Sequence, residues 1–433
     1  MLKKDFFTRN SGKLLWTTVL LAAIPVLVCG KGIVVGDTVT SRLATVYALA
    51  HDHTWRIDRP VDSPPNPFEN RTVDKVTTRD GRLISSKPPI LPLFMTIEYV
   101  AMRRIFGWNL ENEAHLRPIL NAMIITLIRA PHIIGLIFFA LTLRMFMSNF
   151  RDAALLLLAL AYATPLPGYA CQLNNHTPAA AALIVALYFG LGVFTGNLPP
   201  AWWRFMAFGL CSSLVFVLDI PVTIFPAFMG VLLLSRFPRQ SILWAGLGAL
   251  PLLALHFGLM TATTGNPLPV QTQEDMYNFR NSYWRNPIGV DGMNEKRLVY
   301  FFHMHFGRFG TFLLFPVLLL GLPGCLKGIA DRACPARLAV AAGGAAFVVM
   351  TAYYVMKTNN YGGAAYGFRW HIGAVPVLLL LSIPAIPTMT RSWRWALLML
   401  LLAVSVFSAW ECLQAPWGAS HEWTCRWIFG AVN

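Results

Sequence analysis

The chain has 433 residues, of which 56% are hydrophobic and only 13% are charged, and its mean hydropathy is +0.53. A soluble domain carries roughly 25% charged residues, so this composition excludes an ordinary soluble protein and indicates repeated crossing of a membrane. The net charge of +15 does not indicate nucleic-acid binding, because the basic residues stand singly in short loops and at the ends of apolar runs, where they orient membrane proteins.

The first apolar run covers residues 14–35 and follows a basic segment that begins at Lys3 and ends at Lys13. The run is longer than the core of about 7–15 residues in a secretory signal, and no small-x-small cleavage site follows it. We therefore predict a retained first span with the N-terminus in the cytoplasm. The polar stretch that follows, residues 36–117, is predicted to be the first external loop.

One apolar segment inside this loop, Pro88–Gly107, contains Glu98, Arg103 and Arg104. Charges are costly inside a bilayer, and a span here would also reverse the side of every later turn. We therefore predict a helix that lies in the outer interface of the membrane.

Ten further apolar runs follow, which gives about eleven transmembrane helices in a single transmembrane domain. Residues 118–262 are predicted to hold spans two to seven, and residues 309–411 spans eight to eleven. A second external loop covers residues 263–308, and an external tail covers residues 412–433. The ten runs lie at 118–147, 152–171, 178–196, 203–218, 220–235, 241–262, 309–326, 338–356, 371–388 and 394–411.

The charges in the turns support this orientation. Every predicted cytoplasmic turn is short and basic, as the positive-inside rule requires. Acids are rare in these turns and comprise Asp152 and Asp331. The basic residues are Arg144, Arg151, Arg204, Arg236, Arg239, Lys327, Arg332, Arg337, Arg391 and Arg394. The C-terminus is therefore expected on the outer side.

The candidate chemistry begins where the first span ends. Asp37 opens a stretch with helical spacing, Thr38–Ala50, so it is either the N-cap of that helix or a general base at the membrane surface. Arg42, Arg82 and Lys87 follow in the same loop. Such basic groups either meet lipid headgroups, as in any membrane protein, or converge on the phosphate of a lipid-linked substrate.

These features together resemble the GT-C glycosyltransferases, the superfamily of the lipid A aminoarabinose transferases and the protein O-mannosyltransferases. The resemblance rests on the acid directly after the first span, on the basic Arg42 a few positions later and on the Lys-Pro-Pro motif at Lys87. An Arg-Ala-Pro motif at Arg129, which with His132 is expected near the outer surface or in a cavity, is similar to the Arg-Leu-Pro of bacterial members.

The resemblance implies an all-α polytopic membrane protein of GT-C type in a bacterial cytoplasmic (inner) membrane, with a periplasmic active site. Asp37 would then help to deprotonate the acceptor, while Lys87 and Arg42 would bind the donor phosphate. The sequence departs from the family pattern at Thr38, where a second acid is common, and at Ser86, where the family has Glu. The acceptor and any requirement for a divalent metal therefore stay open.

Three polar residues between predicted spans are further candidates on the outer face. Asn175 and His176 join two spans, and Asp219 stands between two others. At the first junction, either Thr177 or the asparagines cap a helix, or Asn175 and His176 line a substrate cavity. Asp219 caps a helix, forms a salt bridge or lines the cavity.

A glycine-rich stretch, residues 357–371, includes Asn360, Tyr361, Tyr366 and Arg369. It is either an irregular linker or a loop that presents polar groups to an outer cavity, because glycine permits tight backbone turns. It resembles the Gly-Tyr-Gly-x-Arg stretches of uncharacterised bacterial members of the superfamily. Arg369 is the candidate contact to the donor phosphate or sugar.

No metal site and no cofactor are predicted beyond the lipid-linked sugar donor, which acts as a co-substrate. His303 and His305 could ligate a divalent metal, but no nearby acid completes a motif. Cys412 and Cys425 flank the predicted tail, and a disulfide between them is one alternative.

The predicted function is the transfer of a sugar from a polyprenyl-phosphate-linked donor to an unknown acceptor, which is a lipid, a glycan or a protein. The expected partners are membrane lipid and the donor, and the chain shows no P-loop or Rossmann signature for a nucleotide. The alternatives are a polytopic transporter or lipid flippase, of which paired repeats and interrupted spans are typical, a polymerase or ligase of surface glycans, and a non-catalytic assembly subunit.

Overall fold

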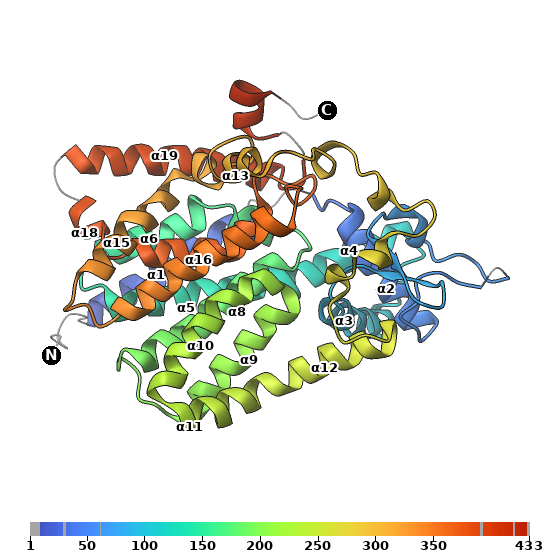
Figure 1. The fold of residues 1–433 in the computed structure, drawn as a ribbon, viewed down its shortest axis with the longest axis horizontal. Helices are drawn as coiled ribbons and strands as arrows, with labels where there is room; N and C mark the ends of the chain where they lie inside the picture. The colour runs from blue at the N-terminus through green and yellow to red at the C-terminus, as the bar shows by residue number, and fades with distance from the viewer. Residues whose placement is uncertain (1–8, 29–31, 61, 390–392, 419–420, 431–433) are drawn as a thin grey trace.

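The computed structural model is almost entirely helical, and most helices lie side by side along the long axis of the molecule (Figure 1). The N-terminal segment Lys3–Lys4, Arg391 and residues 29–31 of the first predicted span lie outside the described residues. The structure describes residues 9–28, 32–60, 62–389, 393–418 and 421–430.

The bundle consists of helices that alternate in direction, with shorter helices and helical turns at their ends. The α-helices of the bundle are α1 (Arg9–Val28), α5 (Ala130–Phe146), α6 (Phe150–Tyr162), α7 (Leu166–Ala170), α8 (His176–Phe194), α9 (Trp202–Leu218), α10 (Ile224–Arg236), α11 (Pro238–Gln240), α12 (Gly246–Thr264), α13 (Arg297–His305), α14 (Thr311–Leu314), α15 (Gly321–Ala330), α16 (Arg337–Lys357), α17 (Val375–Ser382), α18 (Ile386–Met389) and α19 (Trp393–Gln414). The helical turns used below are η2 (Ile125–Arg129), η3 (Ile220–Thr223), η9 (Pro316–Leu320) and η10 (Arg369–Ala374).

Helices suited to a membrane occur throughout the described chain. The five that are long and apolar enough to cross one by themselves are Glu113–Phe146, His176–Phe194, Pro238–Thr264, Arg337–Lys357 and Trp393–Gln414. Shorter apolar helices lie at Leu14–Val28, Trp202–Leu218, Ile220–Arg236, Pro316–Ala330 and Arg369–Leu381. The all-α membrane class is therefore confirmed, whereas the count of about eleven spans stays a prediction.

The two ends of the bundle differ. At one end, the "turn end", short connections at residues 147–149, 195–201 and 331–336 lie with the start of α1 (Figure 1). The long connections, which include residues 32–112 and 265–296, gather at the other end, the "loop end" (Figure 1). This separation matches the predicted division between short basic turns and long polar loops.

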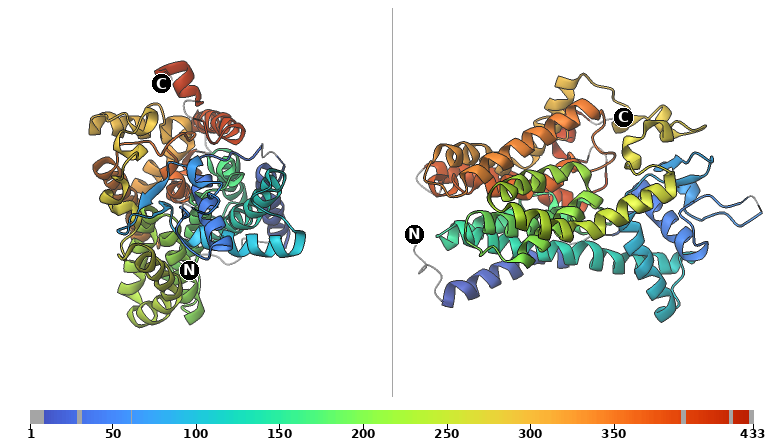
Figure 2. Two further views of the ribbon diagram at one scale, coloured as in Figure 1. Left: turned by 90° about the vertical axis from the view of Figure 1, so that its right-hand side faces the viewer. Right: turned by 60° about the horizontal axis from the view of Figure 1, so that its bottom comes forward.

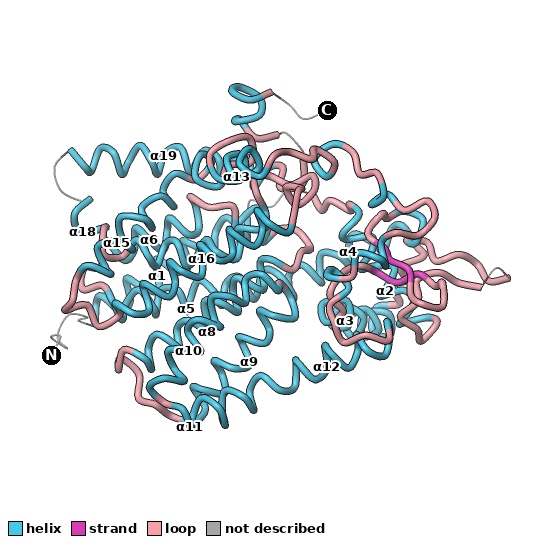
Figure 3. Tube along the Cα trace, in the orientation of Figure 1, coloured by secondary structure: helices cyan, strands magenta, loops and turns pink. Residues whose placement is uncertain are grey.

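The first long loop folds into helices and one small hairpin at the loop end. The helices are α2 (Asp37–His51), α3 (Ile90–Phe106) and α4 (Glu113–Ile124). Strands β1 (Lys75–Thr77) and β2 (Leu83–Ser85) pair antiparallel, with Lys75 opposite Ser85 (Figure 3).

Helix α3 lies across the end of the bundle rather than along it (Figure 2, left). Helix α4, η2 and α5 form one continuous helix of 34 residues, which is about 50 Å long at 1.5 Å per residue. The apolar core of a bilayer is about 30 Å thick, so this helix reaches from the bundle into the loop region. Arg129 and His132 lie within it, and the His132 side chain is buried.

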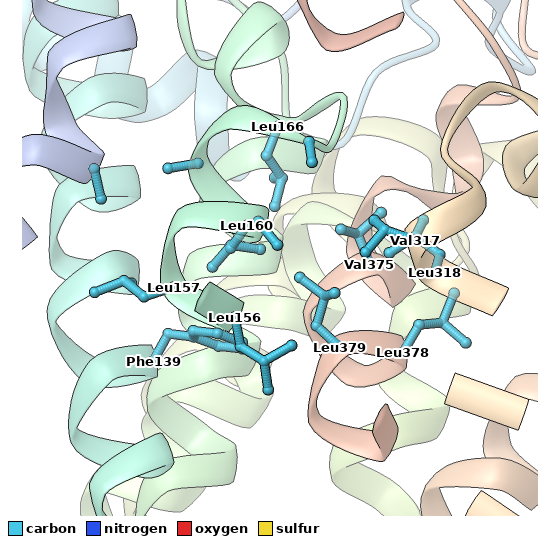
Figure 4. Packing of buried hydrophobic residues seen from close by; sticks show 14 of the residues in the cluster. Phe139, Leu156, Leu157, Leu160, Leu166, Val317, Leu318, Val375, Leu378 and Leu379 are labelled. Atoms are coloured by element: carbon cyan, nitrogen blue, oxygen red, sulfur yellow. The ribbon is translucent and has the colours of Figure 1, made fainter. Parts of the chain in front are cut away.

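Buried apolar side chains join the bundle and the loop region. In the bundle, side chains from α5, α6, η9 and α17 interdigitate, including Leu156, Val317 and Leu379 (Figure 4). Val76 and Ile84 of the hairpin pack against apolar residues at the end of α12 and in the second long loop. The loops therefore form a packed layer that can hold side chains in fixed positions.

Candidate functional site

Asp37 is the first residue of α2, and Gly36 occupies the N-cap position without a side-chain bond. The Asp37 side chain is exposed, and its Oδ1 accepts a hydrogen bond of 2.9 Å from the backbone N–H of Val73. The Thr72 hydroxyl donates to the Asp37 carbonyl at 2.9 Å. The carboxylate therefore holds the segment before β1 and does not cap its own helix, which was one interpretation of the sequence.

The next residue along that segment, Asp74, is only 5% exposed and pairs with Lys87. Lys87 Nζ lies 2.8 Å from Asp74 Oδ2. The Ser41 hydroxyl donates to the Asp74 carbonyl at 2.6 Å, and the Ser86 N–H donates to the same carbonyl at 3.0 Å. Two successive residues, Val73 and Asp74, therefore connect the predicted base to the predicted phosphate-binding lysine.

Arg42 lies on α2 and is 2% exposed. Its Nη1 donates to the Thr38 carbonyl at 3.0 Å, and its Nη2 donates to Asn175 Oδ1 at 2.7 Å. The pKa of Arg42 is lowered to about 10, chiefly by burial. The Asp74 carboxylate opposes this lowering of the pKa, and the Arg369 guanidinium adds to it. The three charged groups are therefore close enough to act on one another.

The pKa of Lys87 shows the same set of neighbours. Burial lowers it, Asp74 raises it through charge and a hydrogen bond, and the charges of Arg42 and Arg369 lower it. The structure thus brings together three of the predicted phosphate-binding residues, from α2, from the loop before α3 and from η10. They surround an acid that the sequence analysis did not select.

Glycines allow the backbone of the glycine-rich stretch, residues 357–371, to pass close to the Arg369 side chain. Gly362 has φ +88°, and a Cβ there would lie 2.9 Å from Arg369 Cγ. A Cβ on Gly363 would lie 3.8 Å from Arg369 Nη2 and 4.0 Å from Asp291 Oδ1. The guanidinium of Arg369 stacks over Trp417, with 5.3 Å from Cζ to the ring centroid. The glycine-rich stretch therefore lets the backbone pass close to this arginine.

The second long loop supplies a further acid and is bonded to the first long loop beside the site. Burial raises the pKa of Asp291, the Arg369 and Lys87 charges lower it and the Asp74 charge raises it. The Tyr283 hydroxyl lies 3.4 Å from Asp291 Oδ2. Trp284 Nε1 donates to the Val73 carbonyl at 3.1 Å, which fixes the second loop to the first.

Arg42, Lys87, Arg369, Asp74 and Asp291 form what we call the charge cluster. The formal charge of these five groups is +1 when all are ionised, because three cations face two carboxylates; Asp219, whose charge also acts on Arg369, is held by His176 and is not counted here. Buried charges are stable only when they are paired, so a cluster with one cation in excess favours a bound anion. Guanidinium and ammonium groups are the usual partners of phosphate oxygens.

A histidine–aspartate pair adjoins the cluster. His176 Nδ1 lies 2.6 Å from Asp219 Oδ2, and both side chains are less than a tenth exposed. Asn175 accepts from Arg42 and donates through Nδ2 to the Leu218 carbonyl at 2.7 Å. The Asp219 charge also acts on Arg369. The three candidates that stand between predicted spans, Asn175, His176 and Asp219, therefore all lie beside the charge cluster.

Arg82 and the two tyrosines of the glycine-rich stretch are engaged elsewhere. Arg82 Nε lies 2.7 Å from Asp58 Oδ2, and within the described chain the structure gives Arg82 no contact with the cluster. Tyr361 donates to Glu295. Among the remaining predicted residues of this stretch, the Tyr366 hydroxyl donates to Glu411 at 2.8 Å, and Asn360 Oδ1 accepts from the Gly362 N–H at 2.9 Å.

The histidines considered as metal ligands have backbone partners. His303 Nδ1 accepts from the Arg308 N–H at 3.1 Å, and His305 Nδ1 lies 2.9 Å from the Phe301 carbonyl. Over residues whose positions are described, no three His, Cys, Asp or Glu side chains gather as a metal site.

The two cysteines considered as a disulfide lie against different carbonyl groups. Cys412 Sγ is 3.7 Å from the Pro165 carbonyl, and Cys425 Sγ is 3.8 Å from the Arg308 carbonyl. The structure therefore does not join them to each other.

No protein-family model and no curated protein matches the sequence. Solved structures do resemble the fold. ArnT from Cupriavidus metallidurans, a lipid A aminoarabinose transferase bound to undecaprenyl phosphate, gives a TM-score of 0.53 at 14% identity, over 92% of this chain and 64% of that chain. The oligosaccharyltransferase AglB from Archaeoglobus fulgidus, in complex with an inhibitory peptide and a dolichol-phosphate, gives a TM-score of 0.50 at 12% identity. The match covers 95% of this chain and 57% of that chain. Both belong to the GT-C superfamily. This chain has the GT-C fold.

The fold predicted from the motifs of the first loop is thereby confirmed, and the GT-C fold with its apolar helices is that of an integral membrane protein. The chain spans about three fifths of the length of the two solved proteins. At identities this low the likeness concerns the GT-C fold and not the reaction.

Asp74 is the residue of the cluster that sequence reasoning missed. It belongs to no motif, but it stands two positions before Val76, and both residues are buried. Asp74 directly precedes β1, and alternate residues of an extended chain share a face, so Asp74 lies on the buried side of the hairpin with Val76. The sequence feature that could have identified Asp74 is therefore its spacing of two residues from an apolar residue that is expected to be buried.

Proposed function

We propose that this protein is a membrane glycosyltransferase that moves a sugar from a polyprenyl-phosphate-linked donor to an acceptor at the outer face of the cytoplasmic membrane. The observation that carries the proposal is the charge cluster at the loop end of the GT-C fold. A sugar linked to a lipid through a phosphodiester has one negative charge at that phosphate, and the cluster has a formal charge of +1. Binding would therefore balance the charge of a buried site.

The three basic residues would act on the leaving group. When the acceptor attacks the anomeric carbon, the bond from that carbon to the phosphate oxygen breaks, and negative charge develops on the lipid phosphate. Arg42, Lys87 and Arg369 would bind this phosphate and stabilise the growing charge, which is the usual task of preorganised cations in such a site.

Asp37 would receive the acceptor proton. Its carboxylate is exposed and lies one residue of backbone away from the Asp74–Lys87 pair, through its bond to Val73. The Asp37 charge also acts on Tyr283, which contacts Asp291 of the cluster. An accessible base beside a phosphate site suits a reaction in which the acceptor arrives from the aqueous side.

The orientation rests on the charges of the turns. Basic turn residues favour the cytoplasm. The connections at 147–149, 195–201 and 331–336, which adjoin or contain Arg151, Arg204 and Arg332, lie at the end of the bundle opposite the first long loop (Figure 1). The cluster and the C-terminus would then lie on the periplasmic side.

The test uses the full chain in proteoliposomes with radiolabelled undecaprenyl-phosphate sugars and a cell-envelope extract as the source of the acceptor, and it follows release of the sugar from the lipid. We expect Asp37→Asn to slow release at least about 100-fold, the usual contribution of a general base, while undecaprenyl phosphate still binds. Asp62→Asn removes an exposed acid from the same loop and serves as the control. Unchanged release in Asp37→Asn would disprove the role of this residue as base.

A further inference from the structure

A cavity opens at the turn end of the bundle, far from the charge cluster. Its volume is about 460 Å³, within the range of roughly 300–1,000 Å³ that small-molecule sites occupy. Residues of α5, α6, α8, α10, α16 and α17 line it, and the short connections that contain Asn149, Asn197 and Asp331 surround its mouth. Nothing in the proposed transfer reaction uses this cavity.

The cavity has a polar mouth and an apolar interior. Leu187 lies on α8, eight residues before the C-cap residue Thr195, which places it about 12 Å deeper at 1.5 Å per residue. Phe225 and Met229 of α10 also line the inner part. The polar lining residues are Ser148, Asn149, Asp152, Thr195, Asn197 and Asp331. A lipid has the same division into a polar headgroup and an apolar chain.

Asp152 is the decisive residue in this lining. It is 3% exposed, and its Oδ1 is buried without a hydrogen-bond partner among the described residues. A buried carboxylate oxygen without a donor is unfavourable, so a bound molecule that carries an N–H donor would stabilise this position. The lining residues include no Lys, Arg or His that could supply one.

The charge pattern of the sequence points to the same place. Asp152 and Asp331 are the two acids found in the otherwise basic turns, and both line this cavity. Each is next to an exposed arginine in the chain, Arg151 and Arg332 respectively. This arrangement is complementary to a zwitterionic headgroup. The cation of the headgroup would lie against the acids inside the cavity, and its phosphate would lie against the arginines at the mouth.

We propose that this cavity binds a membrane phospholipid whose headgroup ends in a primary ammonium, with ethanolamine as the headgroup. The ammonium donates to Asp152 and is further stabilised by Asp331, while the phosphate lies near Arg151 and Arg332. One acyl chain enters the apolar interior beside Leu187. The site is independent of the sugar donor and of the transfer reaction.

Native mass spectrometry of the full chain in detergent tests this proposal with three probe lipids of identical acyl chains, namely dioleoyl phosphatidylethanolamine, phosphatidylcholine and phosphatidylglycerol. Choline has the positive charge without N–H donors, and glycerol has no cation. Because hydrogen bonds to charged groups are strong, we expect the ethanolamine lipid to bind at least about tenfold more tightly than either other lipid.

Variants separate the cavity from the general lipid surface. Asp152→Asn should abolish the preference for ethanolamine, whereas Glu113→Gln, which removes an exposed acid at the loop end, should preserve it. Ala342→Phe places a ring in the cavity wall and should weaken binding of all three lipids. Equal binding of the three lipids by the unaltered chain, or an undiminished preference in Asp152→Asn, would show that only surrounding bilayer lipid occupies the cavity.

Discussion

Replacement of Lys87 by methionine is the most informative perturbation of the charge cluster. The change keeps much of the side chain but removes the ammonium that lies 2.8 Å from Asp74, in a pair whose side chains are 17% and 7% exposed. Breaking a buried pair by removing one partner costs about 3–5 kcal/mol of stability. Arg42 and Arg369 still act on Asp74, so we expect a loss near the lower limit, about 3 kcal/mol.

The same variant should bind undecaprenyl phosphate more weakly. A hydrogen bond to a charged group contributes about 1.5–3 kcal/mol, so the dissociation constant should rise roughly 10- to 150-fold. The assay is titration of the detergent-solubilised chain with undecaprenyl phosphate, alongside thermal unfolding. Lys75→Met is the matched control, because Lys75 pairs with Glu69 in the same loop and its side chain is also 17% exposed. It should lower stability and leave lipid-phosphate binding intact.

Asp74→Asn distinguishes a binding role of Lys87 from a structural one. Loss of this carboxylate raises the formal charge of the cluster from +1 to +2 and releases the Lys87 ammonium from its pair. We therefore expect tighter binding of undecaprenyl phosphate together with lower stability. If Asp74→Asn weakened binding as much as Lys87→Met, the pair would serve only to hold the loop, and Lys87 would not bind phosphate.

Two further predictions concern the glycine-rich stretch. Gly362→Ala should reduce binding of undecaprenyl phosphate, because the new Cβ would displace Arg369; Gly81→Ala, with a similar φ of +77° but no atom within 4 Å, is the control for backbone strain and should leave binding unchanged. Burial raises the pKa of Glu422 from 4.5 to about 7, and its Oε1 accepts from the Gly367 N–H at 2.7 Å. Between these values the folded chain holds a proton that the unfolded chain has released, so stability should fall by about 3 kcal/mol as pH rises from 4.5 to 7. Glu422→Gln should flatten this dependence of the melting temperature, and equal slopes in both proteins would contradict the assignment.

The sequence predicted the positions of the helices because a membrane requires long apolar runs with charges at their ends. The run at 118–147 corresponds to the later part of the helix Glu113–Phe146, and Pro88–Gly107 corresponds to α3 with its arginines in the last turn. The extra length of Glu113–Phe146 was visible, but its continuation into the loop layer depends on packing against α2 and α3, which no local pattern encodes.

The candidate site was predictable only in part, because several of its contacts join residues that are far apart in the sequence. Asp37 and Lys87 are recognisable from their places beside apolar runs. Their connection through Val73 and Asp74 depends on a hairpin that is only three residues long in each strand. The contact of Arg42 with Asn175 joins residues 133 positions apart, so nothing in the sequence around either residue indicates it.

The three cations of the charge cluster come from separate segments, and the fold holds these segments together against the repulsion between their charges. Arg42 comes from α2, Lys87 from the loop before α3 and Arg369 from η10, and each is fixed by contacts within its own surroundings. Their mutual repulsion would separate independent loops, but apolar packing of the hairpin on the second loop and the Trp284 bond to Val73 hold the loops together. The work of bringing the cations together is thus done by the fold before any ligand binds. In the proposed reaction, an arriving phosphate would meet preorganised charges and need little rearrangement, which is the condition under which electrostatic stabilisation of a leaving group is most effective.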